Sequence, residues 1–133
     1  MLSPVEPVDS VLPSVDIVSS VKISDEKTGA YSSTSLRRVD LENRNITSVK
    51  ELSALAPNFY QPDYGSRMTS SMYVRGFGSR IDQPVVGMSV DGVPVLNKNS
   101  YDFELFDIDR AQVMRGAQGL LFGRNTSGGA INL

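Results

Sequence analysis

The sequence predicts an α+β domain with a small mixed sheet of about four strands, short helices and long loops. Three observations lead to this prediction. The dipeptide Asp91-Gly92 lies between two runs rich in β-branched residues, which is the pattern of a β-hairpin. Apolar residues between positions 49 and 56 recur at helical spacing. The stretch Val113–Leu133 holds five of the chain's eleven glycines, with apolar residues between them, and so indicates a packed segment with several tight turns.

Length and composition favour one globular domain and exclude several functions. The chain has 133 residues, of which 40% are hydrophobic and 21% charged, enough to form a core. Its formal net charge is −2, so nucleic acid is not an expected partner. It contains neither Cys nor His, the two best side-chain ligands for transition metals. It therefore also lacks the thiol nucleophile that Cys supplies and the general base that His usually supplies. We therefore expect no catalytic residues, no metal site and no cofactor.

Residues 1–23 are expected to form a flexible N-terminal segment, and residues 24–133 the folded domain. Three prolines within the first fourteen residues favour an extended, unpacked lead-in. The following stretch Val15–Ile23 is rich in β-branched residues. It can be the first strand of the sheet or a peptide that adds to the sheet edge of a partner, and the residues alone favour the strand.

The next elements are a loop, a strand and a helix. Residues 24–35 are rich in Ser and Thr and predict a loop, and Leu36–Val39 is a candidate short strand. Ser48, followed three residues later by Glu51, matches a capping box, in which each side chain bonds a free amide of the first helical turn. Pro57 then ends the helix, because it restricts the residue before it and has no amide to donate.

Three polar loops alternate with the remaining strands. The longest, Asn58–Ser71, carries aromatic residues that either contact a small polar ligand or pack onto the domain. The other two are Gly78–Pro84 and Asn97–Tyr101. The strands are expected at Met72–Phe77, Val85–Val90, Val93–Leu96 and Ile108–Met114, with a helical turn at Asp102–Asp107.

The glycine-rich C-terminal stretch could in principle bind a phosphate group. A phosphate-binding loop needs a Lys followed by Ser or Thr at the start of a helix, directly after the glycines. No Lys follows these glycines, so the sequence favours structural turns.

Three blocks in the C-terminal half resemble the plug domain of TonB-dependent outer-membrane transporters. They are YVRGF at Tyr73–Phe77, VDGVP at Val90–Pro94, and a long block at Asp107–Asn132 that contains DIDR, VMRG and FGRNTSGGAIN. Their order and spacing are those of the family. The chain departs from the family pattern at two positions. Asp109 stands where Glu is commoner, and Ala117 stands where the family usually has Pro. Without this Pro, the turn after Gly116 lacks one rigid φ angle.

The resemblance implies a gate that couples to an energy source, and not an enzyme. In the family, the plug fills the lumen of a 22-stranded barrel in the outer membrane, with its N-terminus facing the periplasm. This chain would be the plug without its barrel. The family's TonB box, which pairs with a strand of the periplasmic protein TonB, resembles the segment Val15, Asp16, Ile17, Val18, Ser19 and Ser20. The rival segment is Asp9–Leu12.

The resemblance also implies roles for single residues. Arg75 and Arg115, from the two Arg-Gly pairs, would latch onto carboxylates of the barrel wall; otherwise they are surface arginines without a partner. A small nutrient ligand, of the siderophore, cobalamin, haem or glycan class, would meet the three polar loops. The residues expected there are Phe59, Tyr60, Gln61, Tyr64, Arg67, Arg80, Asn97 and Asn99. The alternative is an independent periplasmic ligand-binding or signalling module with the same fold.

Overall fold

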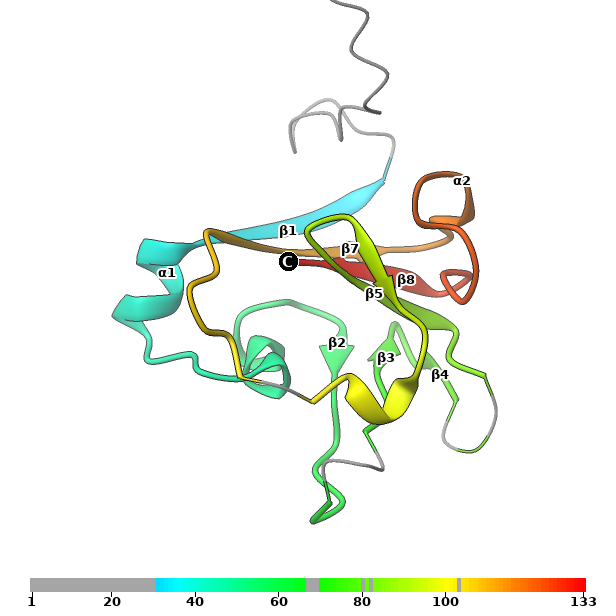
Figure 1. Cartoon of the computed structure of the whole chain (residues 1–133), viewed down its shortest axis with the longest axis horizontal. Coiled ribbons are helices and arrows are strands. Elements are labelled where there is room, and N and C mark those ends of the chain that lie inside the picture. The colour runs from blue at the N-terminus through cyan, green and yellow to red at the C-terminus, as the bar shows by residue number, and fades with distance from the viewer. Residues whose placement is uncertain (1–30, 67–69, 80, 82, 103) are drawn as a thin grey trace, which may run out of the picture.

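The computed structural model describes residues 31–66, 70–79, 81, 83–102 and 104–133 (Figure 1). The expected flexible segment, the candidate TonB box within it, Arg67 and Arg80 all lie outside the described residues.

The main layer is a mixed five-stranded sheet, which confirms the predicted fold class. Its strands lie in the order β1, β7, β8, β5, β6. Only β5 and β8 pair in parallel; the other neighbours are antiparallel. The bounds are Ser32–Arg37 for β1, Val86–Val90 for β5, Val93–Val95 for β6, Arg110–Arg115 for β7 and Gly129–Asn132 for β8. The hairpin predicted at Asp91-Gly92 joins β5 to β6, and both turn residues have positive φ, 50° and 78°.

A second, three-stranded sheet forms where the sequence predicted one strand, Met72–Phe77, and part of the loop Asn58–Ser71. It consists of β2 (Phe59–Tyr60), β3 (Tyr73–Val74) and β4 (Phe77–Gly78), in that order. The prediction of one strand over Met72–Phe77 was wrong, because Arg75 and Gly76 adopt φ of 53° and 82° and reverse the chain. Two successive residues with positive φ make a tight hairpin turn, and β3 pairs back onto β4.

Two local predictions near the start of the described chain were also wrong. Residues 32–35 are not loop but the first part of β1, and Leu36–Val39 is divided between the end of β1 and helix α1 (Arg38–Asn43). The Ser-rich stretch has weak β propensity by itself. It becomes a strand because all six residues of β1 pair with β7.

The segment 102–107 is not the helical turn that the sequence predicted. The amide of Leu105 donates to the carbonyl oxygen of Thr47 at 2.7 Å, and Glu104 forms a β-bridge with Ser48. Pairing with a distant segment therefore uses the backbone groups that a helical turn would need. The other short helices of the described residues are η1 (Val49–Ala54), η3 (Lys98–Ser100) and α2 (Gly119–Phe122).

The core lies between the five-stranded sheet and the layer formed by η1 and the small sheet (Figure 1). The sheet contributes Val86, Met88, Val113 and Ile131, and the opposing layer contributes side chains that are just as deeply buried. Those of the opposing layer are Val49, Leu52, Ala56, Phe59 and Val74. No helix among the described residues has the length and apolar character needed to cross a membrane.

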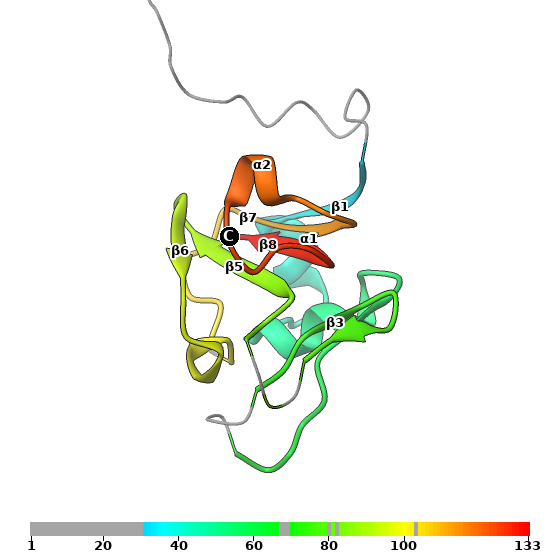
Figure 2. The same ribbon diagram turned by 90° about the vertical axis from the view of Figure 1, so that its right-hand side faces the viewer.

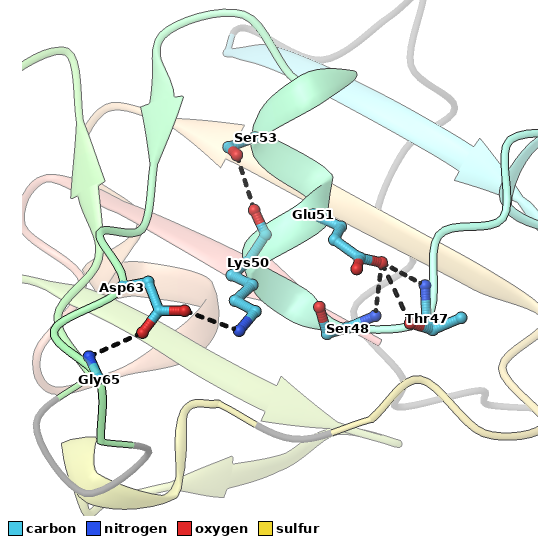
Figure 3. Close-up of polar contacts among 7 residues, drawn as sticks. All are labelled: Thr47, Ser48, Lys50, Glu51, Ser53, Asp63 and Gly65. Atoms are coloured by element: carbon cyan, nitrogen blue, oxygen red, sulfur yellow. Dashed lines mark hydrogen bonds and ion pairs between the residues drawn. The ribbon is translucent and has the colours of Figure 1, made fainter.

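The predicted helix start at Ser48 is present, although the helix is of the 3-10 type. The Glu51 carboxylate accepts hydrogen bonds from the amides of Thr47 at 2.6 Å and Ser48 at 3.2 Å (Figure 3). The amide of Glu51 in turn donates to the carbonyl oxygen of Ser48. These bonds to the charged form, first that from the Thr47 amide, lower the pKa of Glu51, while partial burial opposes the shift.

We expect Glu51→Gln to lower the free energy of unfolding by about 1 kcal/mol at pH 7, since the variant loses the charged acceptor of the cap. Because the folded state lowers the pKa, the carboxylate stabilises the fold above the ordinary carboxyl range. This contribution disappears as the pH falls through the lowered pKa. Urea denaturation of both proteins from pH 7 down to pH 3 measures the difference. Equal stabilities at pH 7 would contradict the prediction.

Candidate functional site

The three loops predicted to face a ligand gather at one end of the domain. Figure 1 shows the loops after β2 and after β4, together with η3, at the lower end, whereas β1 begins at the upper end. Figure 2, turned by 90°, shows the same separation. The described parts of the three loops thus lie together, far from the point where the chain enters its first strand.

The first of these loops carries two exposed tyrosines and two buried residues. Tyr60 is 60% exposed and Tyr64 is 42% exposed. Phe59, by contrast, packs into the core, and Gln61 is buried, with only 5% of its surface exposed. Strand pairing explains the division: β2 has one side toward the core, so Phe59 and Tyr60, which are neighbours, point to opposite sides.

Tyr60 and Tyr64 line an open groove together with residues of the small sheet. The groove has a volume of about 580 Å³ and is lined by Asn58, Phe59, Tyr60, Pro62, Tyr64, Tyr73, Arg75 and Gly76. Tyr73 lies opposite Tyr60 in the β2–β3 register, and its ring packs over Gly78, where a Cβ atom would come within 2.2 Å of it. Sequence reasoning did not assign Tyr73 to the site, because it treated residues 72–77 as one core strand.

An ion pair fixes the loop that carries Tyr64 to helix η1. The Lys50 ammonium lies 3.1 Å from the Asp63 carboxylate, whose other oxygen accepts a hydrogen bond of 2.8 Å from the amide of Gly65 (Figure 3). The Gly65 amide, followed by Lys50, lowers the pKa of Asp63. The side chains of Lys50 and Asp63 are 37% and 63% exposed, so solvent screens the pair, which orients the loop more than it stabilises the fold.

The third loop is held by its own asparagine. The side-chain oxygen of Asn97 accepts a hydrogen bond of 3.0 Å from the amide of Asn99 and caps η3. Asn97 and Asn99 are both exposed at the surface of this loop. Tyr101, which the sequence placed in the same polar loop, is instead fully buried in the core.

The two arginines of the Arg-Gly pairs have different environments. Arg75 is exposed in the β3–β4 turn, and its backbone amide donates to the carbonyl oxygen of Asn58 at 2.8 Å. Arg115 is only 8% exposed. Its Nε donates to Ser32 Oγ at 3.1 Å, and its Nη1 donates to Thr34 Oγ1 at 2.8 Å and to the carbonyl oxygen of Pro57 at 3.2 Å. The alternative of a surface arginine without a partner was therefore wrong for Arg115.

A larger hollow, of about 740 Å³, lies near the Asp91-Gly92 turn and α2. Its lining includes Asp91, Asp107, Asp109 and Arg110 beside Phe122. Within the described residues, no three His, Cys, Asp or Glu side chains are placed so that they could hold a metal ion.

Comparison with known proteins identifies the fold. Residues 25–130 match the family model of the TonB-dependent receptor plug domain. The pesticin receptors of Yersinia pestis and Yersinia enterocolitica are 33% identical over 104 residues, which cover 77% of this chain and 15% of each receptor. The match thus spans about one seventh of the length of these relatives.

Solved structures agree with this match. The ferric yersiniabactin uptake receptor FyuA from Yersinia pestis superimposes with a TM-score of 0.70 at 33% identity, over 77% of this chain and 16% of the receptor. The ferripyoverdine receptor of the outer membrane of Pseudomonas aeruginosa shares the fold, with a TM-score of 0.64 at 23% identity over 84% of this chain and 14% of that chain. These two relatives are described as receptors, one for uptake and one of the outer membrane. With its five-stranded mixed sheet, its two Arg-Gly turns and a family match over residues 25–130, the chain belongs to the TonB-dependent receptor plug domain family.

Proposed function

We propose that this chain is the gate of an outer-membrane receptor that imports an iron–siderophore complex with energy supplied through TonB. The observation that carries the proposal is that the two ends of the domain differ. The three loops with the exposed tyrosines and asparagines lie at one end, and the chain enters β1 at the other (Figure 1). One end is thereby suited to a ligand from outside the cell, and the other to a partner in the periplasm.

The siderophore class is proposed from the relatives. FyuA is described as a ferric yersiniabactin uptake receptor, and the Pseudomonas relative as bound to ferripyoverdine. The groove of Tyr60, Tyr64 and Tyr73 beside Arg75 offers aromatic faces and a cation, which suit a ligand with rings and negative charge. Arg67, Arg80, Asn97 and Asn99 complete the proposed ligand-facing set, whereas the buried Phe59 and Gln61 are left out of it.

Both arginines of the Arg-Gly pairs remain proposed contacts with the barrel, and the buried Arg115 would exchange one of its bonds within the domain for a bond to a barrel carboxylate. Arg75 is exposed on a rigid turn, so its guanidinium can reach a carboxylate of the barrel wall. Arg115 lies close by in the fold, because it binds the carbonyl oxygen of Pro57 while the Arg75 amide binds that of Asn58. The barrel, the siderophore and TonB are thus the proposed partners, with the N-terminus in the periplasm.

The decisive experiment concerns TonB, because an independent ligand-binding module would have no use for it. We expect the periplasmic domain of TonB from the same organism to shift amide NMR signals of Val15–Ser20 in this chain. Replacing Ile17 by proline removes an amide from the added strand and should weaken binding about tenfold or more. Val5→Pro, in the proline-rich lead-in, is the matched control and should bind normally.

Other outcomes have clear meanings. Shifts confined to Asp9–Leu12 would keep the function and move the docking segment. A well-dispersed spectrum without any shift would contradict coupling to TonB and leave the independent module as the better explanation.

A further inference from the structure

Arg115 connects two parts of the plug that are distant in sequence. From strand β7 its guanidinium reaches Ser32 and Thr34 in β1, and also the carbonyl oxygen of Pro57 in the connection between η1 and β2. A buried guanidinium with several hydrogen bonds is a strong fixed point, since bonds to charged donors are about twice as strong as neutral ones. One side chain therefore holds both segments at once.

The segment that contains Pro57 leads directly into the proposed ligand loop. The next carbonyl oxygen along the chain, that of Asn58, accepts a hydrogen bond from the amide of Arg75. Asn58 itself has a positive φ of 60°. Tyr60 and Tyr64 follow within a few residues. A displacement of these tyrosines would thus act on the Pro57 carbonyl through a short, conformationally restricted stretch.

The other contact of Arg115 is made where the chain enters the sheet. Strand β1 is an edge strand that pairs with β7, and Ser32 and Thr34 belong to its first half. Edge strands open more readily than central ones, because only one side is paired. The hydroxyl contacts of Arg115 therefore reinforce the part of β1 closest to the N-terminal segment.

We propose that Arg115 is a positioning residue that couples the ligand loop to the N-terminal strand, so that loosening either segment loosens the other. The proposal rests on the proposed function for its biological meaning: the loop would meet the siderophore, and β1 follows the segment that TonB would pull. The coupling itself is a property of this chain. It can be measured without TonB, ligand or barrel, so its failure and the failure of the proposed function are distinguishable.

The test changes Thr34, because replacing the buried Arg115 itself could unfold the domain. Thr34→Val keeps the shape of the side chain and removes the hydroxyl that accepts from Nη1. Amide hydrogen exchange of the chain should then be about tenfold faster in β1 and also in Phe59 and Tyr60 of β2. Thr34→Ser, which keeps the hydroxyl, should restore the slow exchange.

Ser33→Ala is the matched control on the same strand. The Ser33 hydroxyl is buried and has no hydrogen-bond partner among the described residues, so its removal deletes no such contact. Exchange in β6, at the far edge of the sheet, should be unchanged in all these variants, which separates local coupling from a general loss of stability.

Coupling must also operate in the reverse direction. Asn58→Ala puts a residue that disfavours positive φ next to Pro57 and should speed exchange in β1, whereas Asn58→Gly should not. The proposal is overturned if Thr34→Val speeds β1 alone, if it changes neither strand, or if Asn58→Ala leaves β1 as slow as in the parent chain.

Discussion

Gly129→Ala should destabilise the domain by about 3 kcal/mol, at the upper end of what overpacking of a core usually costs. Gly129 begins β8, which is paired on both sides, with Val86 in parallel and with Arg115 antiparallel. A Cβ atom there would come within 2.6 Å of the Met114 carbonyl oxygen and 3.3 Å of a Val74 methyl group. The closest atom belongs to the backbone of the neighbouring strand, so the sheet itself would have to shift.

Thermal unfolding followed by circular dichroism would show this loss as a fall in Tm of roughly 10 °C for a domain of this size. Gly119→Ala is the control. No atom lies within 4 Å of its added Cβ, and Gly119 stands in helix α2, where alanine is the better helix former. We expect its Tm to equal or exceed that of the parent. A Gly129→Ala protein as stable as the parent would show that β8 does not pair as described.

Tyr101→Ala should cost about 3 to 5 kcal/mol, the usual range for truncating a buried aromatic side chain. Tyr101 directly follows η3 and is fully buried against the core, although the surrounding sequence is polar. Its hydroxyl has no hydrogen-bond partner among the described residues. Tyr101→Phe therefore keeps the packing, and we expect its free energy of unfolding to stay within about 1 kcal/mol of the parent. Urea denaturation at pH 7 distinguishes the two variants, and similar losses in both would contradict the assignment of Tyr101 to the core.

Because of Tyr101, we also expect the stability of the fold to depend on pH in the alkaline range. Burial raises the pKa of Tyr101 to about 12, from the ordinary tyrosine value of 10.0. Below pH 10 the phenol is neutral in both the folded and the unfolded chain, so the stability is unaffected. Between pH 10 and pH 12 the unfolded chain loses its proton first, and the folded state should lose about 2 kcal/mol. Tyr101→Phe lacks this loss, so the difference between the two proteins across this interval measures it.

The sequence determined those elements whose causes are local. The β5–β6 hairpin follows from Asp91-Gly92 because the turn needs two residues that tolerate positive φ, and both are adjacent in the chain. The start of η1 follows from Glu51, because the amides that its carboxylate binds are three and four residues away. The order of the three family blocks was sufficient to indicate the plug fold, which the family match confirms.

Only the tertiary structure decided the features that depend on distant partners. Strand β1 exists because β7, almost eighty residues later, pairs with a Ser-rich stretch of weak β propensity. Tyr101 belongs to the core because it packs with side chains that are distant in sequence, such as Met88 and Ile131. The polar residues next to it in the sequence do not indicate this packing. Arg115 is buried for the same kind of reason: its acceptors come from β1 and from Pro57. Local hydrogen bonds and φ preferences depend on residues that are close in the sequence. Burial and strand pairing depend on residues that come together only when the whole sheet has assembled.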